Sequence, residues 1–111
     1  MSYTLVVFDA STLILLAKIE VLPLVVTRLT AVVTPQVERE ATRQRARWDA
    51  RAVRALIEGR QITVRKAEPA LTRRLAEDFR LEAGEASTLA LTKVQGGIMA
   101  TDDEILITLG A

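Results

Sequence analysis

Short runs of apolar, β-branched residues alternate along the chain with longer amphipathic segments. Residues 4–8 and 30–34 are apolar without polar alternation, which is typical of parallel strands buried on both faces of a sheet. The first run is predicted to form the central strand. Residues 61–65 alternate and predict a shorter edge strand, and residues 98–101 predict a last buried strand.

The segments between these strands have the spacing of amphipathic helices. We expect helices at residues 11–19, 24–29, 70–79 and 85–94, and a long helix that opens at Pro35 and ends at Gly59. Strands separated by crossover helices favour parallel β-α-β units. The predicted fold is therefore an α/β fold: a three-layer α/β/α sandwich around a central, mainly parallel sheet of about four strands.

The composition fits one globular domain over residues 1–111, with 50% hydrophobic and 26% charged residues. The sequence contains no cysteine, which excludes disulfides and thiolate metal sites and favours the cytoplasm. It also contains no histidine, which excludes Ser-His-Asp and Cys-His catalysis and most zinc chemistry. Carboxylates, hydroxyls, lysine, arginine and one tyrosine remain for chemistry.

No membrane association is expected. Residues 13–33 form the most apolar stretch, but Lys18, Glu20, Pro23 and Arg28 interrupt it well short of the roughly 20 residues that a membrane span needs. The N-terminus has no basic leader before its apolar run, so we expect no secretory signal.

Carboxylates follow the predicted strands at the points where these strands end. Asp9 follows the first strand, and Asp102 and Asp103 follow the last. Glu40 lies in the first turns of the helix after the second strand, and Glu85 begins the helix before the last strand. If the strands are parallel, these groups meet at one edge of the sheet, where ligands bind in open α/β folds.

Clustered carboxylates repel one another unless a cation neutralises them or they keep protons. Hard divalent ions prefer oxygen ligands, so Mg²⁺ or Mn²⁺ is the expected occupant. An ion so held can promote phosphodiester hydrolysis without histidine. Taken singly, each acid also has a simpler interpretation as a helix cap, a favourable charge at a helix N-terminus or a solvated helix charge.

Four motifs appear in the same order as in a known family: VVFDAS at residues 6–11, PQVERE at 35–40, GEASTLAL at 84–91 and TDD at 101–103. Together they resemble the PIN-domain family over nearly the whole chain. The resemblance implies a metal-dependent ribonuclease that acts on single-stranded RNA, commonly the toxin of a prokaryotic toxin–antitoxin pair.

The resemblance also assigns roles to individual residues. It implies catalytic acids at Asp9, Glu40, Glu85 and Asp103, and Mg²⁺ or Mn²⁺ ligands at Asp9, Glu85 and Asp103, with Asp102 in second rank. Glu40 matches the acid of a Val-x-x-Glu pattern that begins at Val37. Ser11 matches a hydroxyl often found beside the metal.

One departure concerns the C-terminus. Chains of this family usually continue past the last acid through another helix and a strand, whereas here residues 105–111 are short and apolar. We expect a domain without the usual last helix and strand. An alternative function is therefore a truncated or inactive PIN-like module that binds RNA or an antitoxin without catalysis.

The charge distribution indicates how RNA would be held. Arginines concentrate between residues 39 and 60, and Arg39, Arg43 and Arg47 are the candidate substrate-binding residues, with help from Arg65, Lys66, Arg73 and Arg74. The alternative is a solvated helix face. Base stacking is poorly supported, because Trp48 is expected at an apolar helix position and Phe8 and Phe79 in the core.

Residues 13–29 are too apolar for a fully solvated pair of helices, which favours burial by a second copy or an antitoxin. The alternative is that these helices only form the core.

Two other enzyme classes place an aspartate after the first strand. A haloacid-dehalogenase-type phosphatase needs a second aspartate where Ser11 stands, and a receiver domain needs a late lysine after a strand, whereas Lys93 lies within a predicted helix.

Overall fold

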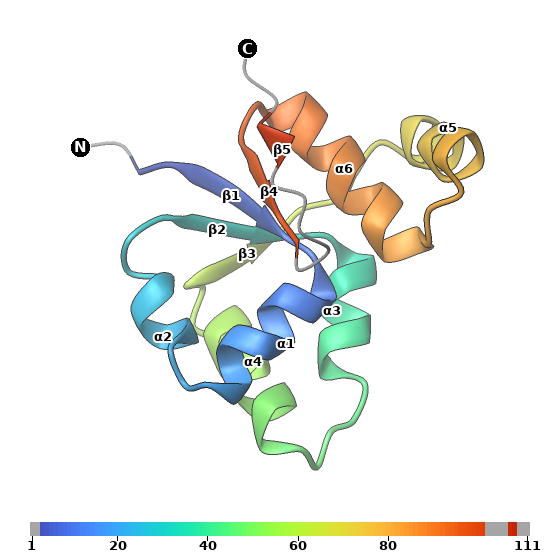
Figure 1. Ribbon diagram of the computed structural model, residues 1–111. Helices are drawn as coiled ribbons and strands as arrows, with labels where there is room; N and C mark the ends of the chain where they lie inside the picture. Colours follow the sequence, from blue (N-terminus) through green and yellow to red (C-terminus); the bar gives the residue numbers. More distant parts are fainter. Residues whose placement is uncertain (1–2, 102–106, 109–111) are drawn as a thin grey trace.

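The computed structural model describes residues 3–101 and 107–108. Its centre is one five-stranded sheet in the order β3-β2-β1-β4-β5 (Figure 1). The strands are β1 (Leu5–Phe8), β2 (Thr30–Val33), β3 (Ile62–Val64), β4 (Ile98–Ala100) and β5 (Ile107–Thr108). The first four are parallel, and β5 runs antiparallel to β4. The predicted parallel strands, the central place of β1 and the edge place of β3 are confirmed, whereas β5 was not predicted.

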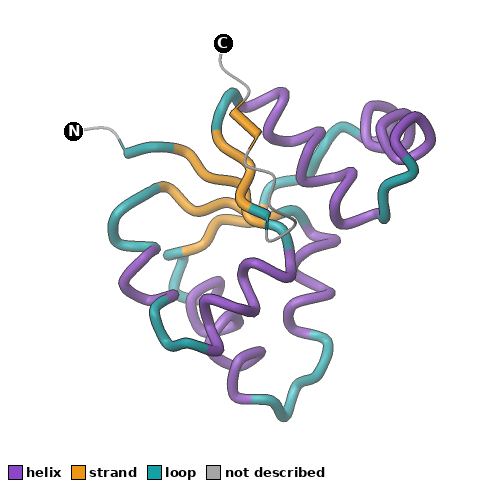
Figure 2. Tube along the Cα trace, in the orientation of Figure 1, coloured by secondary structure: helices purple, strands orange, loops and turns teal. Residues whose placement is uncertain are grey.

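Helices cover both faces of this sheet, which confirms the three-layer α/β/α fold. They are α1 (Ala10–Lys18), α2 (Leu22–Val25), α3 (Pro35–Thr42), α4 (Trp48–Glu58), α5 (Pro69–Phe79) and α6 (Ala83–Gln95). Figure 2 shows α5 and α6 on one side of the strands and the other helices on the opposite side. Within the described residues, no helix has the length and apolar character to cross a membrane.

The core is built from the alternating side chains of the strands. Phe8 and Val33 point into the larger cluster, which also contains Val37 and Val53 from α3 and α4. Val7 and Val32 point to the other face and meet Leu91 of α6. Successive strand residues face opposite sides of a sheet, so a strand covered on both faces has to be apolar throughout.

The predicted long helix is wrong, because the chain turns between Thr42 and Trp48 and forms two helices, α3 and α4. In one straight helix Val37 and Val53 would be about 24 Å apart, at 1.5 Å per residue. Both are fully buried in the same cluster, and α1 contacts both helices. The turn thus folds α4 back over α1 and allows both valines to join one core.

Two aromatic side chains are also more exposed than the sequence predicted. Phe8 is buried as expected, but Phe79 is 63% exposed and Trp48 is 47% exposed. Trp48 is the first residue of α4, whose buried positions are Asp49, Ala50 and Val53. Phe79 ends α5, a helix in which no residue is fully buried. In the layer formed by α5 and α6, α5 therefore lies at the outside of the fold.

Candidate active site

Asp9 lies where β1 ends and α1 begins, next to the end of β4. Its backbone N–H donates to the Ala100 carbonyl oxygen at 3.0 Å. Asp9 is 3% exposed, and its Oδ1 accepts hydrogen bonds from the Thr12 N–H at 2.9 Å and the Ser11 hydroxyl at 3.4 Å. Asp9 is thus the N-cap of α1, and both of these bonds go to one oxygen of the carboxylate.

A buried polar contact joins the start of α3 to the start of α6. The hydroxyls of Thr34 and Ser87 are 2.8 Å apart, and both side chains are fully buried. Thr34 Oγ1 also accepts from the Val37 N–H at 3.3 Å, and the Ser87 hydroxyl donates to the Gly84 carbonyl oxygen at 2.9 Å. Since a buried hydroxyl without a partner is costly, these bonds fix the two helices relative to each other.

Glu40 lies on α3 against the first turn of α6. Its Oε2 is only 3.0 Å from the position that a Cβ atom would occupy at Gly84. A glycine at this position therefore lets the carboxylate of Glu40 approach the backbone of α6.

These elements bring Asp9, Ser11, Glu40 and Glu85 to one cavity of about 260 Å³ at the carboxyl edge of the sheet. We call it the acidic cavity. Glu82, which the sequence analysis did not select, also lines it. Glu82 is the N-cap of α6 and has an extended backbone, so its position just before the helix, and not helical spacing, brings it to the cavity.

The donor chemistry of the acidic cavity fits a hard divalent cation, because the predicted ligands are all carboxylates. However, the described residues contain no group of three or more acidic side chains placed to hold one ion. Asp102 and Asp103 follow Thr101 at the end of β4 and lie outside the described residues. Asp9, Glu40 and Glu85 thus share a cavity but do not complete a metal site by themselves.

Of the predicted substrate-binding arginines, Arg39 and Arg43 line a second cavity of about 430 Å³, which we call the middle cavity. Glu40, Glu82 and Gly84 line both the middle and the acidic cavities. Positive charge thus lies directly beside the acidic cavity.

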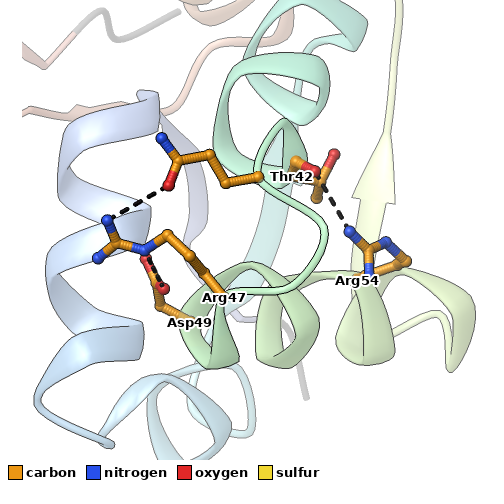
Figure 3. A network of polar contacts seen from close by, with 5 residues as sticks. Thr42, Arg47, Asp49 and Arg54 are labelled. Atoms are coloured by element: carbon orange, nitrogen blue, oxygen red, sulfur yellow. Dashed lines mark hydrogen bonds and ion pairs between the residues drawn. The ribbon is translucent and has the colours of Figure 1, made fainter.

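Arg47 is held differently, in the loop between α3 and α4 (Figure 3). Its Nε donates to Asp49 Oδ1 at 3.0 Å and its NH1 to Gln44 Oε1 at 3.4 Å. Arg54 donates to the Thr42 carbonyl oxygen at 3.2 Å and braces the other end of the loop. Burial alone would raise the pKa of Asp49, but the hydrogen bond and charge of Arg47, with the charge of Lys18, hold this pKa below its usual value.

Comparison with known proteins places this arrangement in a family. No curated protein and no solved structure matches the chain. A family model described as a PIN domain matches residues 5–107, which include all the acids discussed above. Because this match covers nearly the whole chain, the chain belongs to the PIN-domain family.

Proposed function

We propose that this protein is a metal-dependent endoribonuclease that cleaves single-stranded RNA, and that it is the toxin of a toxin–antitoxin pair. PIN domains are generally nucleases, which supports nuclease chemistry for this chain. The observation that carries the proposal is the convergence of Asp9, Glu40 and Glu85, from three separate segments, on one cavity. This cavity lies at the sheet edge where open α/β folds bind their ligands.

In this proposal Asp9, Glu85 and Asp103 hold Mg²⁺ or Mn²⁺, with Asp102 as a further ligand. Such an ion, when bound, polarises a phosphoryl oxygen and lowers the pKa of a water molecule. Asp9 is prepared for this role because the Thr12 N–H and the Ser11 hydroxyl fix the orientation of its carboxylate. The helix-capping interpretation and the ligand interpretation of Asp9 are therefore compatible.

The other side chains position the substrate and handle protons. In a chain without histidine, Glu40 is the carboxylate available to accept a proton from the attacking water. Arg39 and Arg43, in the adjoining middle cavity, attract the phosphates next to the cleaved bond. In this proposal the carboxylates act in bond cleavage and the arginines bind the RNA strand.

The second candidate function is a non-catalytic module that binds RNA or an antitoxin. It is favoured by one observation, that the described acids do not complete a metal site. This module keeps the arginines of the middle cavity but has no cleavage activity.

We further propose that α1 and α2 form a protein interface, in a homodimer or with an antitoxin. Leu15, Ile19 and Leu24 are 48%, 58% and 60% exposed, although they belong to the most apolar part of the sequence. We propose these three exposed apolar side chains as the contact residues of the interface. The absence of cysteine supports a cytoplasmic location for such a complex.

The test of the nuclease is cleavage of labelled single-stranded RNA by the purified chain in Mg²⁺, in Mn²⁺ and in EDTA. We expect cleavage only with metal, and a loss of about a hundredfold or more in Asp9→Asn, because charge stabilisation by the ion contributes several kcal/mol. Asparagine caps helices as well as aspartate does, so this substitution preserves α1.

The matched control is Glu38→Gln beside Glu40→Gln. Both residues lie on α3, but only Glu40 lines the acidic cavity. Glu40→Gln should slow cleavage and Glu38→Gln should not. Cleavage that persists in EDTA, or an unchanged rate in Asp9→Asn, contradicts the metal mechanism, whereas RNA binding without cleavage favours the non-catalytic module.

A further inference from the structure

A third cavity, of about 370 Å³, lies between α3, α5 and the start of α6. We call it the basic cavity. Its lining combines Arg39 of α3, Lys66 of the β3–α5 connection and Arg73 of α5 with the polar groups of Gln36 and Thr72. None of the described residues that line it is acidic. The helix α3 and the distant segment formed by α5 and the connection before it therefore place three cations around one cavity.

These three cations are not neutralised locally. Within the described part of the chain, none of Arg39, Lys66 and Arg73 takes part in an ion pair. Glu68 is the acid nearest to Lys66 in sequence, but its Oε2 accepts a hydrogen bond from the Leu71 N–H at 2.6 Å and caps α5. Like charges gathered without counter-charges create a positive potential that attracts an anion.

The basic cavity is a neighbour of the middle cavity, which in turn adjoins the candidate active site. It shares Gln36, Arg39 and Ala83 with the middle cavity. The middle cavity in turn shares Glu40, Glu82 and Gly84 with the acidic cavity. The acidic, middle and basic cavities therefore follow one another from Asp9, past the first turns of α3 and α6, to Arg73. Figure 1 shows α3 and α6 meeting at the end of the strands, with α5 beyond α6.

A fourth cavity, beside the loop between α3 and α4, adjoins the acidic cavity at Glu40 and is less positive than the basic cavity. The cavity there is lined by Lys18, Arg43 and Arg47, but also by Glu40 and Asp49. Three positive charges thus face two negative ones, and Arg47 is already paired with Asp49 at 3.0 Å. The basic cavity, with three cations and no carboxylate, offers the stronger attraction for a polyanion.

We propose that the basic cavity binds a phosphate of the RNA strand that flanks the phosphate in the acidic cavity. Lys66 and Arg73 hold this flanking phosphate, and Arg39 lies between the two positions. The substrate strand thus leaves the active site along α5 and not along the loop between α3 and α4. This inference rests on the proposed function in that it takes RNA as the substrate, but it does not require cleavage.

The test is RNA binding by metal-free protein, followed as fluorescence anisotropy of a labelled oligouridylate of about ten nucleotides over a range of salt concentrations. Lys66→Gln and Arg73→Gln should each weaken binding roughly three- to fivefold, as expected for an exposed charge contact. Each should also reduce the slope of log affinity against log salt by about 0.7, because one phosphate contact with a single strand is lost.

Lys93→Gln is the matched control, because Lys93 is an exposed cation on α6 that lines none of the basic, middle and acidic cavities. It should leave the affinity and the salt slope unchanged. A labelled dinucleotide, which has no flanking phosphate, should bind the wild type and Arg73→Gln equally well.

Equal effects of Lys66→Gln and Lys93→Gln on RNA binding, or no effect of Lys66→Gln and Arg73→Gln, overturn the proposal. The same conclusion follows if the wild type binds no RNA but binds a labelled acidic peptide through Lys66 and Arg73. If the wild type cleaves RNA and these variants bind and cleave it normally, the nuclease proposal is supported and the phosphate site in the basic cavity is wrong. If RNA is bound through Lys66 and Arg73 but never cleaved, the phosphate site is supported and the nuclease proposal is wrong.

Discussion

Gly84→Ala should separate the stability of this protein from its activity. The added methyl group would lie 3.0 Å from Glu40 Oε2 and 3.9 Å from Val37 Cγ2. Ordinary contacts begin near 3.4 Å, so only the Glu40 carboxylate has to move, by a few tenths of an ångström. Glu40 is exposed and flexible, so this movement costs little folding energy.

Two opposite effects follow. Alanine is the better helix former, and we expect the free energy of unfolding to stay constant or rise by up to about 0.5 kcal/mol. A displacement of 1 Å can reduce the rate of an enzyme about a hundredfold, so a few tenths of an ångström should slow RNA cleavage roughly three- to sixfold.

The assays are urea denaturation and single-turnover RNA cleavage, combined in a double-mutant cycle. Gly84→Ala should have no further effect on the cleavage rate in Glu40→Gln, but it should keep its full effect in Glu38→Gln. A rate unchanged by Gly84→Ala, or an equal loss in both backgrounds, would refute the contact with Glu40 as the cause.

Three further predictions concern stability. Asp49→Asn should lower the free energy of unfolding by about 2 kcal/mol at pH 7, because Arg47 loses its charged, buried partner. The pKa of Asp49 is lowered in the folded state. The contribution of its charge to stability is therefore fully present above the unfolded pKa of about 3.9 and disappears as the pH falls through the folded pKa. The free energies of unfolding of the two proteins, measured by urea denaturation, should converge at acid pH, and a difference that stays constant down to the folded pKa would contradict the pairing. Thr34→Val should lower the free energy of unfolding by about 2 kcal/mol, because it removes the cap of α3 and the hydrogen-bond partner of Ser87. Thr63→Val, on the exposed side of β3, should change thermal stability little. Equal effects of the two substitutions would argue against the contact between Thr34 and Ser87. Thr12→Val should leave stability unchanged or raise it by up to about 1 kcal/mol, because Thr12 Oγ1 is buried without a hydrogen-bond partner among the described residues; a loss above about 1 kcal/mol would reveal a role for this hydroxyl.

The sequence predicted the sheet well because its signal is local. The apolar runs that contain Val7 and Val32 are buried on both faces, and an unbroken apolar run of this length is typical of a parallel strand covered on both sides. The same reasoning placed Asp9 at the end of β1 and Glu40 on the helix after β2, and both line the acidic cavity. A carboxylate at the end of a parallel strand is positioned by the topology alone.

The features that the sequence did not reveal depend on tertiary contacts. Residues 43–47 are mostly good helix formers, and the turn there is fixed by contacts of α1 with both α3 and α4. Burial of Phe79 was predicted from its apolar character, but α5 lies at the outside of the fold. The sequence analysis selected Arg39, Lys66 and Arg73 as cations that attract RNA, but their placement around one cavity depends on how α3 packs beside α5 and could not be predicted from local patterns.

The most direct test of a cation site at the carboxyl edge of the sheet is a calorimetric titration of Mn²⁺ into the metal-free protein without RNA. We predict saturable binding to the wild type and to Glu38→Gln, with strongly weakened binding to Asp9→Asn. The same isotherm for the wild type and Asp9→Asn, or no binding to either, would contradict a metal-dependent active site built around Asp9.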